Sequence, residues 1–134
     1  MAGISARRLV VALDCPDARE LAEFYAAMLG WRVVADEEDP RWVDVVPPEG
    51  DRGPMALACQ SVPDFRAPTW PGGPVPAQVH LDFYVDSIAD AEPAVLAAGA
   101  RRHDHQPSPV QPSPDGRFVV YLDPVGHPFC LCME

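Results

Sequence analysis

The feature that most constrains this chain is a degenerate internal repeat with a spacing of about 70 residues. Gly30 and Gly99 lie 69 positions apart, and Val10 and His80 lie 70 apart. Each copy has the pattern of a strand, a capped helix that ends at glycine, and three further strands. A βαβββ unit cannot bury its sheet face alone, so the two copies are expected to pack together. The repeat therefore predicts an α+β protein built from two βαβββ modules.

In the first copy, the helix is the clearest element. Apolar residues recur with helical spacing between Asp17 and Gly30. Asp17 is the expected N-cap, with Glu20 as its capping-box partner, and Gly30 is the expected C′ residue. The stripe consists of Leu21, Phe24, Tyr25, Met28 and Leu29. Short apolar runs predict the strands of this copy at 9–13, 31–35, 42–46 and 55–60.

The second copy restarts after a stretch, 63–76, that is rich in proline and glycine and has no periodicity. Ser87 is the expected N-cap of its helix, 88–98, and Gly99 the stop. Its strands are predicted at 79–85, 101–103, 118–122 and 128–132. At 134 residues the chain suits one domain, 1–134. Within it we expect module one at 7–60, a linker at 61–77 and module two at 78–134.

The composition limits the classes of partner and the compartment that are expected for this chain. The net charge of −10 argues against nucleic acid and against anionic membranes. The sequence has no apolar run of about 18 residues and no signal-peptide core near its start, so a cytoplasmic location is expected. None of the four cysteines forms a CxxC pair, and free thiols are expected in a reducing compartment.

Six short segments, taken in order, resemble members of one known family. The chain is similar to vicinal-oxygen-chelate proteins, the glyoxalase/bleomycin-resistance-like superfamily, and within it to an actinobacterial-type subgroup. The resemblance implies a curved eight-stranded mixed sheet with helices outside, a pocket inside the curve, and homodimers. The segments are 13–17 (LDCPD), 24–25 (FY), 29–31 (LGW), 68–71 (PTWP) with 80–82 (HLD), and 123–130 (DPVGHPFC).

Alternation of side chains along each strand predicts which residues face the pocket. In 79–85 the apolar set should meet the helices, which leaves His80, Asp82 and Tyr84 facing inward. His80 has a second interpretation, an inner-face histidine that only hydrogen-bonds a neighbour, and Trp70 could simply anchor the linker. The predicted pocket is lined by His80, Asp82, Tyr84, Tyr121 and Cys130, with Gln60 and Trp70 at its rim.

The resemblance also bears on metal binding. Metal-dependent members of the superfamily place ligands on the first, fourth, fifth and eighth strands. The corresponding residues here are Val10 (or Val11, if the register slips by one), Gln60, His80 and Cys130. Valine cannot bind a metal, and catalytic sites need about three protein ligands. We therefore expect neither a metal nor another cofactor.

Two classes of function stay open. One is a binding protein that sequesters a small metabolite or drug, with Gln60, Trp70, Tyr84, Tyr121 and Cys130 as ligand-binding residues. The other is an enzyme, a metal-free isomerase or lyase that uses His80 and Asp82 for proton transfer; a divalent-metal-dependent lyase or dioxygenase is the second alternative. The expected partners are a small molecule and a second copy of the chain. The segment 104–116, with four prolines, is either a lid over the pocket or an exposed surface loop with no role there.

Overall fold

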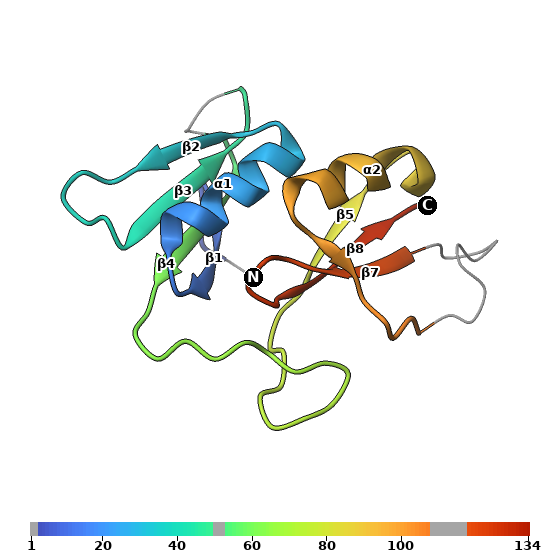
Figure 1. The fold of residues 1–134 in the computed structure, drawn as a ribbon. Coiled ribbons are helices and arrows are strands. Elements are labelled where there is room, and N and C mark those ends of the chain that lie inside the picture. Colours follow the sequence, from blue (N-terminus) through green and yellow to red (C-terminus); the bar gives the residue numbers. More distant parts are fainter. Residues whose placement is uncertain (1–2, 50–52, 108–117) are drawn as a thin grey trace. The chain divides into compact units, whose positions relative to one another are not determined.

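In the computed structural model, which describes residues 3–49, 53–107 and 118–134, the strands form two four-stranded sheets (Figure 1). The first sheet has the order β1-β4-β3-β2, with β1 and β4 parallel and the other pairs antiparallel. Its strands are β1 (Leu9–Cys15), β2 (Arg32–Ala35), β3 (Trp42–Val46) and β4 (Met55–Ser61).

The second sheet repeats this connectivity in the order β5-β8-β7-β6, again with one parallel pair, β5 and β8. Its strands are β5 (Leu81–Tyr84), β6 (Arg101–Arg102), β7 (Phe118–Leu122) and β8 (Pro128–Cys132). The two βαβββ modules predicted from the repeat are therefore confirmed, each with a sheet of its own. The chain divides into two compact units, Met1–Phe65 and Arg66–Glu134.

Helix α1 (Ala18–Leu29) begins after the predicted N-cap Asp17 and ends at the predicted Gly30. The Asp17 carboxylate accepts hydrogen bonds from the backbone N–H groups of Arg19 and Glu20, at 3.0 and 3.2 Å. Gly30 ends the helix with φ +69°, a left-handed conformation that glycine adopts without strain. The apolar stripe packs on β3 and β4 of its own sheet and is buried at Leu21, Phe24 and Tyr25.

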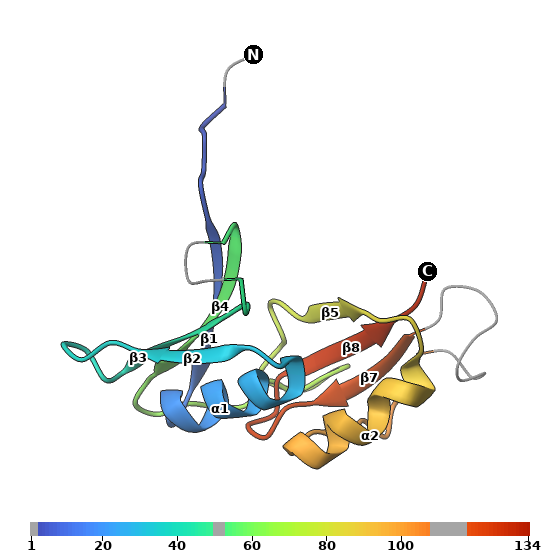
Figure 2. The ribbon, with the colours of Figure 1, turned by 90° about the horizontal axis from the view of Figure 1, so that it is seen from above.

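Helix α2 (Ile88–Ala98) is capped by the Ser87 hydroxyl, which accepts from the Asp90 backbone N–H at 3.1 Å. Phe129 lies at the centre of the second unit's core and is fully buried. Its ring stacks on Tyr121 at 5.6 Å between centroids and meets Phe83 edge to face at 5.9 Å. Phe129, Tyr121 and Phe83 therefore lie on the face of the sheet that is on the α2 side. The two views in Figures 1 and 2 show each helix with the strands of its own unit.

The structure corrects one predicted side chain. Tyr121 was expected in the pocket, but it lies on the α2 side, fully buried, with its hydroxyl beside the ion pair of Glu92 and Arg102. The residues of β7 are apolar or aromatic on both faces of the strand, so alternation alone did not show which face points toward α2. Burial, and then the Glu92 carboxylate, raise the pKa of Tyr121 to about 12, so the phenol is neutral at pH 7.

Most of the segment 104–116 lies outside the described residues, so its expected role as a lid or as an exposed surface loop stays open. Neither helix in the described ranges has the length and hydropathy required to cross a bilayer.

Candidate small-molecule site

The open face of the second sheet, opposite the α2 side, carries two adjoining hollows. The apolar hollow has a volume of about 240 Å³. The acidic hollow lies next to it and contains Asp82, Tyr84 and Cys132. His80, Phe118 and Cys130 line both hollows and so form the wall they share. The other walls of the apolar hollow include Trp70, Val79, Pro107, Val120 and Pro128.

The polar centre of this surface is a pair on the first strand of the module. His80 lies just before β5, and its Nε2 lies 3.2 Å from Oδ1 of Asp82. The two residues are two apart, so their side chains share a face of the strand. Both side chains are about half exposed, at 56% and 43%. The imidazole and the carboxylate are therefore oriented by each other and remain available to a ligand.

The two cysteines of β8 face the same surface. Burial, and then the nearby Asp82 carboxylate, raise the pKa of Cys130 to about 12. The same causes raise the pKa of Cys132 to about 11. Both are therefore neutral thiols at pH 7, whereas a nucleophilic cysteine requires a lowered pKa. They contribute a polarisable, largely apolar floor, packed against Val120, Trp70 and Phe118.

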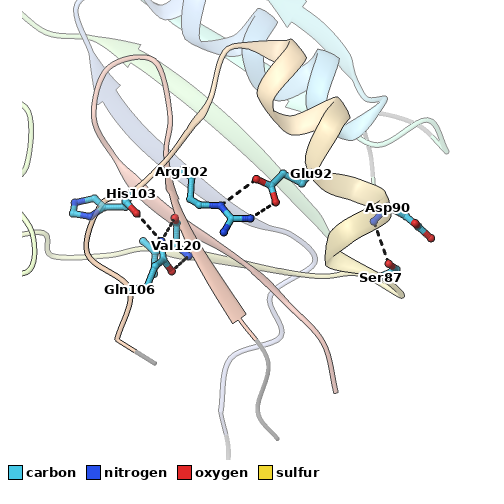
Figure 3. A network of polar contacts seen from close by, with 7 residues as sticks. All are labelled: Ser87, Asp90, Glu92, Arg102, His103, Gln106 and Val120. Carbon is cyan, nitrogen blue, oxygen red and sulfur yellow. Dashed lines mark hydrogen bonds and ion pairs between the residues drawn. The ribbon is translucent and has the colours of Figure 1, made fainter. Parts of the chain in front are cut away.

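Trp70 is held by a short segment that follows β6. Its ring meets the imidazoles of His103 and His105 edge to face, with centroids 5.2 and 5.5 Å away. Gln106 fixes this segment to β7, because its amide pairs with Val120 as a neighbouring strand would. The Gln106 side chain donates to the Val120 carbonyl and accepts from the Val120 N–H, both at 2.9 Å (Figure 3). It also donates to the His103 carbonyl at 2.8 Å.

The structure brings together five of the seven residues predicted for the pocket. His80, Asp82, Tyr84 and Cys130 line the acidic hollow, and Trp70 lines the apolar one. Tyr121 is absent from this surface, as described above. Gln60 belongs to the first unit, exposed on β4 opposite Asp14 and Trp42, and its part in the pocket stays a prediction.

Sequence reasoning left out several lining residues. Phe118 lies in register with Cys132, and Val120 with Cys130, so both face the hollows. Their position follows from the alternation of β7 once Tyr121 is assigned to the α2 side. Gln106 and Pro107 gave no comparable signal, because their contribution depends on the fold of a segment without regular structure.

Three potential metal donors meet at the shared wall. The ligand atoms of His80, Asp82 and Cys130 all lie within 4.8 Å of one another. The position on β1 at which metal-dependent members carry a ligand is Val10, which has no donor atom. The donors present are thus a clustered set in the second unit, and they do not fit the ligand set that the resemblance implies, which includes a ligand on β1.

Comparison with known proteins agrees with this architecture. Residues 10–132 match the family model described as a glyoxalase-like domain. No curated protein sequence matches the chain.

Solved structures with the same fold include three proteins with low sequence identity to this chain. A glyoxalase/bleomycin resistance protein from Albidiferax ferrireducens is 17% identical, with a TM-score of 0.63 over 93% of this chain and 96% of that one. TnmS3, an antibiotic binding protein from Streptomyces, is 18% identical, with a TM-score of 0.59 over 100% and 99%. The fosfomycin resistance protein FosX from Listeria monocytogenes is 15% identical, with a TM-score of 0.64 over 100% and 94%. Since the family model spans nearly the whole chain and both βαβββ modules, the chain belongs to the glyoxalase-like domain family.

Proposed function

We propose that this glyoxalase-like domain binds and sequesters a small, largely apolar metabolite or drug without the help of a metal. The observation that carries the proposal is the His80–Asp82 pair, at 3.2 Å, beside a hollow whose other walls are mainly apolar. Small-molecule sites commonly combine an apolar lining with a few convergent polar groups. TnmS3 is an antibiotic binding protein and FosX is a fosfomycin resistance protein, and both are consistent with a small-molecule role on this fold.

A second candidate is a metal-free isomerase or lyase. His80 and Asp82 are the groups such an enzyme would use, His80 as the proton acceptor and Asp82 to orient and stabilise the imidazolium. The 3.2 Å separation and the half-exposed side chains favour this candidate as well as binding. The two functions differ in one measurement, because only the enzyme converts a bound compound into a product.

Ligand binding should depend on His80. In a thermal-shift screen of small metabolites and drugs, a ligand at 100 times its dissociation constant should stabilise the protein by about 2.7 kcal/mol. The variant His80→Ala should lose this stabilisation, while its own stability changes by less than about 0.5 kcal/mol because the side chain is half exposed. His127→Ala, outside both hollows, is the matched control. Unchanged ligand binding by His80→Ala would refute the site.

Purified protein should carry no stoichiometric transition metal, because Val10 stands at the β1 position where metal-dependent members carry a ligand, and its side chain has no donor atom. Elemental analysis after purification without chelator is the measurement. One equivalent of zinc, nickel or iron in the wild type, lost in His80→Ala, would show that the metal-dependent alternative is correct.

We also propose that the chain forms a cytoplasmic homodimer and belongs to the actinobacterial-type subgroup. In the described sheets β1 and β5 are edge strands, and Leu9 and Tyr84 on them are about 60% exposed, at 58% and 64%. Unpaired edges with apolar side chains favour association, which in homo-oligomers is usually twofold. Light scattering should give twice the mass of one chain; a 14.6 kDa particle at all concentrations would exclude the dimer.

A further inference from the structure

The two hollows differ in character, and the difference bears on the ligand. The apolar hollow is bounded by Trp70, Phe118 and Val120, and its volume of about 240 Å³ lies below the roughly 300–1,000 Å³ of common drug-sized sites. It therefore suits a compact ring system. The acidic hollow begins at the shared wall, where the ligand atoms of His80, Asp82 and Cys130 lie within 4.8 Å of one another. A polar substituent on such a ring, placed at the shared wall, would therefore lie on the side of Asp82.

The charges around the shared wall favour one sign of ligand. The carboxylate of Asp82 is the acidic group of its hollow. Among the described residues that line either hollow there is no arginine, and the chain contains no lysine. The net charge of −10 adds a negative field over the whole molecule. Burial is the main cause that raises the pKa values of Cys130 and Cys132, and the Asp82 carboxylate adds to both shifts.

Aromatic rings add a second source of cation affinity. Trp70 and Phe118 border the apolar hollow, and Tyr84 borders the acidic one. The face of an aromatic ring attracts an ammonium group, and most strongly where water is partly excluded. An anion at the same place would meet the carboxylate of Asp82.

We infer that the ligand of this site is a small aromatic or polycyclic amine, held with its ring system in the apolar hollow and its ammonium group at Asp82. The inference rests on the proposed binding function and specifies its ligand class. His80 then has a defined part, because its pairing with Asp82 keeps the carboxylate oriented toward the wall that the hollows share. A neutral analogue keeps the ring contacts and loses the ion pair, and a carboxylate analogue meets repulsion.

Three probes with one ring system test the inference: 2-naphthylmethylamine, 2-naphthylmethanol and 2-naphthoate, which are cationic, neutral and anionic at pH 7. Dissociation constants are measured by calorimetry at low salt and again at high salt. We expect the amine to bind about tenfold more tightly than the carboxylate, with the alcohol between them and the difference reduced by salt. Asp82→Asn should reduce the amine to the affinity of the alcohol and leave the alcohol unchanged.

Two controls make the result specific. Asp82→Glu keeps the charge and should retain the preference for the amine. Asp90→Asn removes the same charge from the first turn of α2, outside both hollows, and should also retain it. Equal or tighter binding of the carboxylate, or an amine preference that survives in Asp82→Asn, would overturn the inference. Failure of all three probes to bind would instead count against the small-molecule pocket itself, and so against the proposed function.

Discussion

Replacing Phe129 with alanine should lower the free energy of unfolding by about 3–5 kcal/mol, the usual range for removing a large ring from a core. Phe129 is fully buried on the α2 side of β8. It stacks on its cross-strand partner Tyr121 and meets Phe83 edge to face, so alanine would leave a cavity bordered by two rings. Urea denaturation followed by circular dichroism measures the change.

Phe118→Ala is the matched control, because it removes the same side chain from the other face of the same sheet. Phe118 is half-buried and lines the hollows, so its loss should be clearly less destabilising and should weaken ligand binding instead. Equal destabilisation by the two variants would mean that the faces of β7 and β8 have been assigned wrongly.

The helices and most strands of this fold were readable from the sequence because each has a local cause. The Asp17 and Ser87 caps and the two terminal glycines mark both helices independently of tertiary structure. The strand before α2 was less certain: β5 begins at Leu81, and Val79, expected on the helix side, is 60% exposed and lines the apolar hollow. Alternation predicts side-chain direction only where the backbone is actually a strand.

Site residues could be predicted on a strand whose two faces differ in polarity, and were harder to predict on a strand that is apolar on both faces. His80 and Asp82 alternate with the apolar residues Leu81 and Phe83, so the polar face was evident. In β7 every residue is apolar or aromatic, so the alternation of side chains does not distinguish its two faces. Tyr121 lies on the face opposite the hollows, beside Glu92 of α2 and Arg102 of β6. The amide of Gln106 reaches Val120 across 14 positions of sequence, a contact that no local pattern encodes.

Gly73→Ala should weaken ligand binding by at least about tenfold while lowering stability by about 1–3 kcal/mol, the usual cost of a strained backbone. Gly73 has φ +115°, a conformation that residues with a side chain rarely adopt. A Cβ at this position would lie 2.5 Å from Oγ1 of Thr69 and 2.7 Å from its Cβ. That hydroxyl closes the turn, since it donates to the Val75 carbonyl and accepts from the Val75 N–H, both at 3.0 Å.

Gly73→Ala should weaken ligand binding through Trp70, the residue that follows Thr69 in the chain. Trp70 directly follows Thr69 and forms a wall of the apolar hollow, so a displaced Thr69 moves the ring that should contact the ligand. Gly72→Ala is the matched control: a Cβ there meets nothing within 4 Å, and binding should be unchanged. Thr69→Val, which removes the hydroxyl and keeps the shape, should weaken binding in the same direction as Gly73→Ala. Calorimetric titration of the three variants decides the matter, and wild-type affinity in Gly73→Ala would show that this turn does not set the position of Trp70.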